Sequence, residues 1–379
     1  MSKAKRTVLF LLAAACLLPL CGCWDYRDIE DMSVAMGMAI DRTKDGDYLL
    51  TTEIAKPDEE EAEAYRVEAK GRTVAECMEN TGKKLEKEVY WANVQVFVIG
   101  EEVAKEGLMP LADIAERQRE LRPTLRLAVS KEETARELLE TDGLSTEIVS
   151  MELSGVLKNC EEKMSKASVP ALYEVVSDMT GGGKDVSLPA LKKVVNEDNE
   201  TAELDGTAVF ADNRLAGYLT DEESRALLFV QGGVKGGTLV IEDPEISDVR
   251  RQVTLQLIRS ATGIRPKLTG GKPAVDVRIR AEAAVGENGA GTDYNARDTR
   301  ERLERLAGEE VARSVEDLIR KVQLEYGADI FGFGSVVKDR LPGYWKRRGG
   351  GWSEAFKDLP VNVAAEVDIL GGGLIKEPY

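Results

Sequence analysis

The distribution of apolar residues predicts alternating strands and helices in the first half of the chain. Residues 33–40 and 48–55 are apolar runs on either side of the turn sequence Asp45-Gly46, which predicts a hairpin. Residues 93–100 are a short, dense apolar run typical of a central strand, and residues 125–129 predict another strand. Apolar residues at helical spacing predict helices in four further segments: 74–89, 110–120, 130–140 and 149–164.

The second half of the chain has a different pattern, which begins near residue 205. Gly181-Gly182-Gly183 and the polar residues 196–200 interrupt the periodicity, and they place a domain boundary at 180–205. The triple glycine lacks the lysine with serine or threonine of a phosphate-binding loop, so a flexible loop is the simpler interpretation. Beyond it, Asp212-Asn213 predicts a hairpin turn, and residues 253–257, 275–279 and 361–369 alternate as strands do.

One long amphipathic helix, residues 298–326, is expected to lie on a sheet of these later strands. The predicted fold class is therefore α+β and multi-domain, with mixed or antiparallel sheets and packed helices. The expected organisation is a signal peptide at 1–22, an N-terminal region at 23–200 with two subdomains, and a C-terminal α+β domain at 205–379.

The N-terminus has the plan of a secretory signal. Lys3, Lys5 and Arg6 precede an apolar stretch at 8–18, which is too short for a membrane-spanning helix of about 20 residues. The following Leu20-Cys21-Gly22-Cys23 resembles the bacterial lipobox, with Cys23 as the residue that receives lipid. The alternative is an ordinary cleaved signal whose cysteines are incidental.

A lipid on Cys23 would replace a transmembrane helix as the membrane anchor. The resemblance implies a diacylglyceryl group on the Cys23 sulfur and no other cofactor. Two acyl chains give stable anchoring, because each buried methylene contributes about 0.8 kcal/mol and one chain binds only reversibly. Residues 24–379 contain no apolar run long enough to span a bilayer.

Charge and composition exclude several functions. The chain has a net charge of −17 and no histidine. Such an acidic surface argues against nucleic-acid binding and against electrostatic adhesion to anionic lipid headgroups. Without histidine, Ser-His-Asp catalysis is excluded and the commonest metal ligand is missing. The acidic clusters precede helices or lie in loops, so we assign no catalytic residue and no metal site.

Two cysteines remain in the mature chain besides Cys23. Cys77 and Cys160 both fall on apolar faces of predicted helices. Free cysteine is a good small core residue, which is the simpler interpretation. A disulfide between them is the alternative, and the sequence does not decide it.

Five motifs spread over the mature chain carry a family resemblance. They are Cys23-Trp24-Asp25 with Arg27-Asp28-Ile29-Glu30; residues 37–41 (GMAID); residues 95–101 (QVFVIGE) with Ala104 and Gly107-Leu108; residues 206–210 (GTAVF) with Leu215, Gly217 and Leu219; and Gln323 with residues 329–334 (DIFGFG), Trp345, Trp352 and Phe356. In this order they resemble the Ger(x)C spore germination lipoproteins, the C subunits of nutrient germinant receptors. One departure is Trp91-Ala92-Asn93, where relatives often carry a histidine.

The resemblance implies a non-enzymatic, lipid-anchored receptor subunit with a three-domain α+β fold. It further implies a place on the outer leaflet of the inner spore membrane, with A-type and B-type membrane subunits as partners. A solute-binding lipoprotein of a transporter is the alternative, although such chains usually show two repeated βα lobes. A carboxylate-based glycosidase is a third and weaker hypothesis.

The segment next to the lipid site supplies the first candidate contact residues. Trp24, Asp25 and Arg27 lie within a few residues of Cys23, where a tryptophan is favourable at a bilayer interface. They are candidates for contact with a partner or the membrane. Packing under the first domain is the alternative.

The C-terminal motif supplies the second group of candidates. Phe331 and Phe333 are expected to anchor a helix-to-loop corner in the core, with a partner-docking loop as the alternative. Trp345 and Arg347 belong to the basic run Trp345-Lys346-Arg347-Arg348. This run is a candidate contact for anionic lipid or an acidic subunit, or else a solvated loop.

Overall fold

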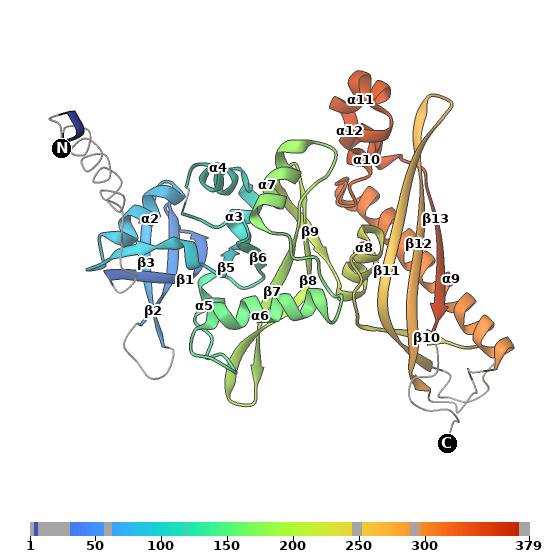
Figure 1. Ribbon diagram of the computed structural model, residues 1–379, viewed down its shortest axis with the longest axis horizontal. Coiled ribbons are helices and arrows are strands. Elements are labelled where there is room, and N and C mark those ends of the chain that lie inside the picture. The colour runs from blue at the N-terminus through green and yellow to red at the C-terminus, as the bar shows by residue number, and fades with distance from the viewer. Residues whose placement is uncertain are drawn as a thin grey trace.

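A computed structural model describes residues 4–6, 31–56, 63–118, 120–244, 252–288, 294 and 296–370. Two sheets lie side by side along the long axis, a nine-stranded sheet from the first part of the chain and a four-stranded sheet from the last (Figure 1). The mixed α+β class expected from the sequence is confirmed. Within the described residues, no helix has the length and apolar character that crossing a bilayer requires.

The nine-stranded sheet has a parallel centre and antiparallel edges. Its strands run in the order β3-β2-β1-β5-β6-β7-β8-β9, and β4 also pairs with β1. Strands β1, β5, β6 and β7 are parallel to one another, whereas both outer hairpins are antiparallel. The strands are β1 (Met32–Arg42), β2 (Tyr48–Ala55), β3 (Ala64–Gly71), β4 (Glu88–Tyr90), β5 (Val96–Ile99), β6 (Arg126–Ser130), β7 (Ser187–Asn196), β8 (Asn199–Ala211) and β9 (Arg214–Leu219).

Helices cover both faces of this sheet (Figure 1). One face packs against α2, α3, α4 and α7, and the other against α5 and α6. The parallel central strands are consequently buried on both sides, which explains the continuous apolar run at 96–99. The helices are α2 (Val74–Gly82), α3 (Glu101–Glu106), α4 (Met109–Arg117), α5 (Arg136–Leu139), α6 (Val149–Glu162) and α7 (Leu172–Gly181).

The four-stranded sheet has the order β10-β11-β12-β13 and carries one long helix, as predicted. Helix α9 presents Leu303, Val311 and Val315 to the core and continues as a π-helical turn over Val322–Tyr326. Helix α8 adds its apolar residues to the same core. The elements are α8 (Asp221–Gln231), β10 (Thr238–Glu242), β11 (Gln252–Thr269), β12 (Lys272–Asn288), α9 (Arg297–Lys321), α10 (Phe333–Arg340), α11 (Pro342–Arg348), α12 (Trp352–Lys357) and β13 (Val361–Ile369).

Several sequence expectations are confirmed and others are corrected. The hairpin turn at Asp212-Asn213 has two positive φ angles of 49° and 65°, as a type I′ turn requires. The helix expected at 74–89 ends at Gly82, because the chain then returns to pair β4 with β1. Strand β3 was not predicted, because this strand pairs through β2 alone and its polar residues hide the alternation.

Most of the expected boundary region at 180–205, from Ser187 onward, lies within strands β7 and β8 of the large sheet. Strands β7 and β8 pair antiparallel, and the polar residues 196–200 form the tip of their hairpin, where Glu197 has a positive φ of 56°. The polar composition therefore marks an exposed turn rather than a linker. Strands β7, β8 and β9, which together run from Ser187 to Leu219, are consecutive strands of this one sheet.

The two cysteines of the described chain are unpaired and buried. Cys77 packs on one face of the large sheet and Cys160 on the other. Burial raises the pKa of the Cys77 thiol to about 11, so it remains protonated near neutral pH. Both thiols act as small core residues, which confirms the simpler interpretation.

Helix α6 sits so close to the large sheet that one strand position requires glycine. A Cβ on Gly37 would lie 2.3 Å from the Ser150 Cβ. We expect Gly37→Ala to lower the free energy of unfolding by about 1–3 kcal/mol through overpacking. Chemical denaturation measures this change.

Gly155 provides the matched control. It lies on α6, the helix that carries Ser150, and a Cβ there meets nothing within 4 Å. Gly155→Ala should raise stability by up to about 1 kcal/mol through helix propensity. A Gly37→Ala variant as stable as the native chain would contradict this packing.

Candidate functional site

The loop between α9 and α10 is organised by one buried carboxylate. Asp329 Oδ1 accepts hydrogen bonds from the N–H groups of Gly332 (2.9 Å) and Phe333 (3.1 Å). Its Oδ2 accepts from Gly334 N–H (2.7 Å) and from Trp352 Nε1–H (2.8 Å). These bonds satisfy donors at the start of α10 and tie α12 to the same point. Gly332 has a φ of 79°, which suits glycine at this position.

The environment of Asp329 changes its acidity. Complete burial raises the pKa of its carboxyl group to about 6, although the N–H donors of Gly334 and Trp352 favour the ionised form. The nearby Asp185 carboxylate raises it further. This carboxyl group therefore changes charge within the range of pH found in cells.

Three phenylalanines pack around this loop. The rings of Phe331 and Phe333 stack with centroids 5.1 Å apart, and Phe356 lies 6.3 and 6.5 Å from them. Phe333 and Phe356 are fully buried, and Phe331 is 4% exposed. The corner is thus anchored in the C-terminal core, in agreement with the structural interpretation of the motif.

The triple glycine at 181–183 docks directly on this loop. Ser335 N–H donates to the Gly183 carbonyl (2.9 Å), and Lys338 Nζ donates to the Gly181 carbonyl (2.7 Å). A Cβ on Gly183 would lie 2.7 Å from the Gly334 carbonyl carbon, and a Cβ on Gly334 would lie 2.7 Å from the Gly183 Cα. Two backbones therefore touch where a side chain on either would separate them.

Asp185 completes the contact between the two parts of the chain. Its N–H donates to the Asp329 carbonyl (2.9 Å), and its Oδ2 accepts from Asp329 N–H (2.7 Å). Its Oδ1 accepts from Asp212 N–H (3.4 Å) at the tip of the β8–β9 hairpin. Burial raises the pKa of Asp185. We call residues 181–185 together with 329–335 and Trp352 the junction.

A groove of about 570 Å³ lies beside the junction. Helix α7, the end of α8, strand β11 and the Phe331-Gly332 turn form its walls. Its polar residues include Lys184, whose Nζ donates to Asp178 Oδ2 at 2.6 Å. The groove lies beside the junction, between the domain of the large sheet and the C-terminal domain.

Two further buried carboxylates cap helices in the N-terminal part. Asp41 accepts hydrogen bonds from the N–H groups of Ala135 (2.6 Å) and Arg136 (3.1 Å) at the start of α5. Glu53 accepts from Val149 N–H (3.1 Å) and Ser150 N–H (2.8 Å) at the start of α6. Burial raises the pKa of Asp41. Acids on β1 and β2 thus position both helices of one face.

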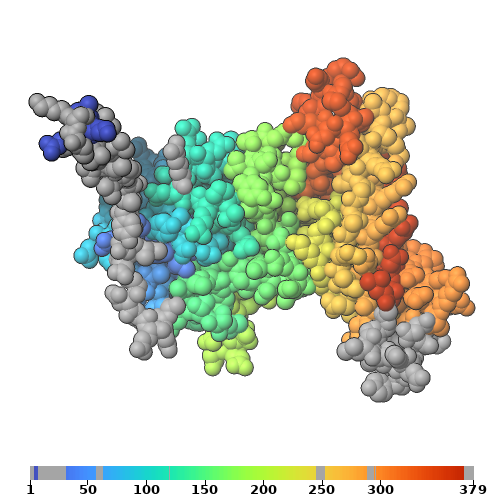
Figure 2. Space-filling view, viewed as in Figure 1, coloured from blue at the N-terminus to red at the C-terminus, as the bar shows by residue number. Residues whose placement is uncertain are grey.

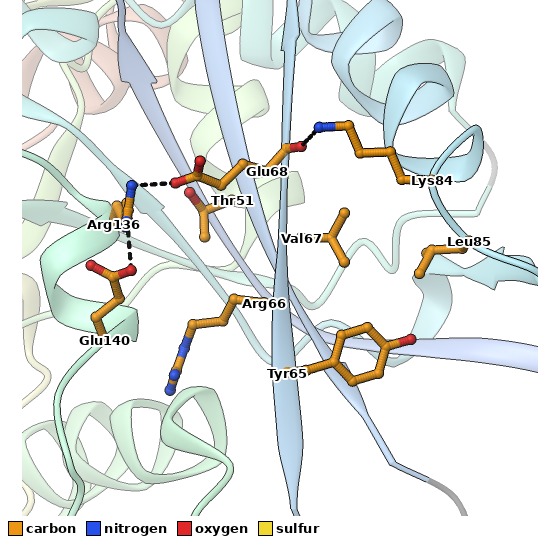
Figure 3. A pocket seen from close by; sticks show the side chains of 9 residues that line it. All are labelled: Thr51, Tyr65, Arg66, Val67, Glu68, Lys84, Leu85, Arg136 and Glu140. Carbon is orange, nitrogen blue, oxygen red and sulfur yellow. Dashed lines mark hydrogen bonds and ion pairs between the residues drawn. The ribbon is translucent and has the colours of Figure 1, made fainter.

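The surroundings of α5 are polar and extensively paired. Figure 3 shows a pocket of about 440 Å³ beside β3, in which Arg136 bridges Glu68 and Glu140. Lys84 donates to the Glu68 carbonyl in the same pocket. These pairs fix the edge strand to α5.

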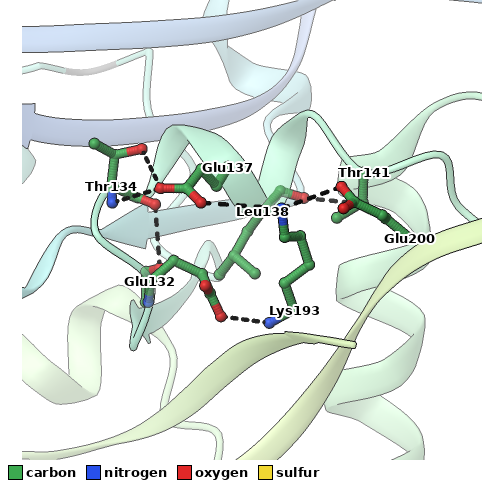
Figure 4. Close-up of polar contacts among 8 residues, drawn as sticks. Glu132, Thr134, Glu137, Leu138, Thr141, Lys193 and Glu200 are labelled. Atoms are coloured by element: carbon green, nitrogen blue, oxygen red, sulfur yellow. Dashed lines mark hydrogen bonds and ion pairs between the residues drawn. The ribbon is translucent and has the colours of Figure 1, made fainter. Parts of the chain in front are cut away.

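On the other side of α5, a second network reaches the β7–β8 hairpin. Glu137 accepts from the N–H and hydroxyl of Thr134, and Glu132 accepts from Lys193 N–H at 2.7 Å (Figure 4). Lys193 Nζ pairs with Glu200 at 3.1 Å. The carboxylates of this network thus serve to hold the α5 loop on the β7–β8 hairpin. Within the described ranges, no group of three acids or cysteines is arranged to hold a metal ion.

The residues predicted to contact a partner or the membrane lie in different environments. Cys23, Trp24, Asp25 and Arg27 lie outside the described residues. Trp345 is half-buried against Trp352, with ring centroids 5.7 Å apart, and a Cβ on Gly183 would lie 3.0 Å from its ring. Arg347 is exposed on α11. Contact of these residues with a partner or membrane stays a prediction.

Sequence reasoning missed the contacts that Gly183 and Asp185 make at the junction. It also missed the role of Asp329 as the hydrogen-bond acceptor for four N–H donors. An acid three residues before Gly332-Phe333-Gly334 was the available signal for a capped helix start. No local signal reveals that Gly183 meets Gly334, because the contact is between distant segments.

Comparison with known proteins assigns this chain to a class of spore germination proteins. A family model described as "Spore germination protein N-terminal domain" matches residues 25–193. A second, described as "Spore germination B3/ GerAC like, C-terminal", matches residues 205–373. The chain therefore belongs to the GerAC-like family of spore germination proteins.

Individual relatives match this chain over nearly their whole length. The chain is 25% identical to spore germination protein B3 of Bacillus subtilis (strain 168) over 98% of both chains. It is 23% identical to spore germination protein KC of the same organism, over 99% of this chain and 98% of that one. The crystal structure of the GerBC protein matches with a TM-score of 0.58 and 20% identity, covering 90% of this chain and all of that one.

The junction predicts a difference between two glycines of the same Gly181-Gly182-Gly183 run. Gly183→Ala introduces a Cβ into backbone contact at a φ of 90°, and we expect it to lower the free energy of unfolding by about 2 kcal/mol or more. Gly181→Ala is the matched control, because its Cβ meets nothing within 4 Å. Equal thermal midpoints for the two variants would contradict the contact.

The pKa of Asp329 predicts a titration visible at its indole partner. The Trp352 Nε1–H resonance should shift with a midpoint near pH 6, and Asp329→Asn should abolish the shift. Because the folded-state pKa lies above that of an unfolded aspartate, this residue's contribution to stability is greatest below pH 4 and falls as the pH rises through 6. A midpoint near pH 4 would contradict the desolvated site.

Proposed function

We propose that this chain is the lipid-anchored, non-enzymatic C subunit of a spore nutrient germinant receptor. The observation that carries the proposal is its full-length match to spore germination proteins, through both family models. The subunit scaffolds or couples two membrane-embedded partners, an A-type and a B-type subunit, during the exit from dormancy. No nucleic acid takes part.

The proposed anchor is a diacylglyceryl group on Cys23, after removal of residues 1–22. The apolar stretch, small residues and cysteine in order support it. Two acyl chains suffice to hold a body that has no apolar helix of spanning length among its described residues. The body then lies on the outer leaflet of the inner spore membrane.

The junction supports a coupling role. It joins the large sheet to the C-terminal domain through backbone contacts and paired aspartates rather than through an open linker. A displacement of one domain would therefore carry the other with it. A subunit whose domains move together can transmit a movement from one partner to another without catalysing a reaction.

The transporter alternative receives less support. The C-terminal domain is a four-stranded sheet, antiparallel over β10-β11-β12 with β13 parallel to β12, and one long helix covers it. It differs from the first domain, so the chain does not consist of two repeated βα lobes. The family match also favours germination over solute transport.

Replacing the proposed lipid site tests the anchor. Cys23→Ala should move the protein from the membrane fraction to the soluble fraction or leave an intact leader, and it should impair the germination triggered by nutrients. Germination by agents that bypass receptors should be unchanged. Fractionation, mass spectrometry of the N-terminus and spore germination assays measure these outcomes.

Cys21→Ala is the matched control, because it removes the neighbouring thiol and keeps Leu20, Gly22 and Cys23. It should leave anchoring and germination intact. An unmodified Cys23 in the native mature protein would refute the anchor, and a normal nutrient response from soluble Cys23→Ala protein would refute its role.

A further inference from the structure

Positive charge is concentrated at one end of the C-terminal domain, although the chain as a whole is acidic. Residues 262–280 and 333–351 together contain ten Lys or Arg and two Asp, in a chain with a net charge of −17. The first segment is the outer part of the β11–β12 hairpin, and the second spans α10 and α11. Average charge therefore hides a basic surface.

The fold brings the two segments together. Helix α10 contacts β11 directly, and Ile264 on the inner face of β11 packs against the same hydrophobic cluster as Leu341, Tyr344 and Trp345 of α11 and its N-cap. Figures 1 and 2 show the hairpin tip and the α10–α12 lobe projecting side by side at the top of the C-terminal domain. We call these projecting segments, 262–280 and 333–351, the basic end.

Several cations of the basic end are exposed and have no ion-pair partner among the described residues. They are Arg265, Lys272, Arg278, Arg340, Lys346, Arg347 and Arg348. Lys267, by contrast, pairs with Asp276 at 2.7 Å. Unpaired cations on these projecting segments attract anions rather than serve the fold.

The packing of α11 fixes where its cations point. Trp345 lies against Trp352, and a Cβ on Gly349 would lie 2.7 Å from the Trp345 ring. Lys346, Arg347 and Arg348 are thereby held outward on a helix attached to the junction. A fixed array loses less conformational entropy on binding than a mobile tail.

The hairpin tip adds an exposed apolar residue. Leu268 is 46% exposed and lies between Lys267 and Lys272, at the turn formed by Gly270 and Gly271 with φ angles of 60° and 80°. An apolar side chain flanked by lysines suits the boundary between headgroups and acyl chains.

From this juxtaposition we propose that the basic end is a second membrane contact, which binds anionic phospholipid headgroups. Both elements project, so they can touch a plane together but do not enclose an extended acidic peptide. The proposal rests on the membrane location proposed above. It assigns the body a defined orientation, with the C-terminal domain held down on the bilayer.

Vesicle binding tests the basic end without any acyl chain. The probe protein is the whole mature chain, residues 23–379, with Cys23→Ser. It should bind vesicles of phosphatidylglycerol and phosphatidylcholine, bind much less to phosphatidylcholine alone, and lose binding at high salt. Because the lipid site is absent, the result is independent of the outcome for Cys23→Ala.

Charge reversal locates the contact. The triple variant Lys346→Glu, Arg347→Glu and Arg348→Glu should weaken binding by about a hundredfold, since each cation near an anionic leaflet contributes about fivefold. The control reverses three exposed lysines on the N-terminal part, Lys44→Glu, Lys83→Glu and Lys158→Glu, with the same change in net charge. It should lose much less.

Three outcomes would overturn the proposal. They are an absence of binding to the anionic vesicles, equal binding to neutral ones, and equal loss in the α11 and control variants. Circular dichroism of both variants excludes unfolding as the cause of a loss. Without anionic lipid binding, the basic end would instead be assigned to an acidic protein partner.

Discussion

The architecture depends on a backbone-to-backbone contact that a single buried carboxylate makes possible. Asp329 gathers donors from Gly332, Phe333 and Gly334 and from the Trp352 indole, and so fixes the loop that Gly183 touches. The mutual hydrogen bonds between Asp185 and Asp329 then join the two sheet systems. A buried acid that accepts several N–H bonds is costly to desolvate and specific in geometry, which suits a position that must hold one arrangement.

The two contacts proposed above would give this joined body a defined relation to a membrane. The proposed lipid site lies before the first strand of the large sheet, and the basic end projects at the top of the C-terminal domain (Figure 1). Contacts at both would restrain the orientation of a rigid body, whereas one flexible tether would not. The negative net charge of the whole chain argued against adhesion to anionic lipid. That argument does not extend to the basic end, because an average over the chain conceals the segregation of charge into an acidic body and a basic end.

The sequence predicted what depends on local pattern and missed what depends on distant contact. The hairpins at 45–46 and 212–213 and the long helix α9 have turn residues and apolar spacing that suffice to predict them. Strand β3 lacks such a pattern because it lies at a polar sheet edge. The triple glycine suggested a flexible loop, and only the fold shows that Gly183 must lie against Gly334. Likewise, the cations of β11 and α11 are far apart in sequence, and the fold brings their elements to the same end of the C-terminal domain.

The most direct test of the joined body is the distance between its two parts in solution. Spin labels on Lys158→Cys in α6 and Glu316→Cys in α9, both exposed positions, report this distance by pulsed electron resonance in the mature chain carrying Cys23→Ser. The buried native thiols are protected from labelling. A single narrow distance distribution is the result we predict. A broad or two-peaked distribution would show that the domains move independently and would contradict a rigid junction.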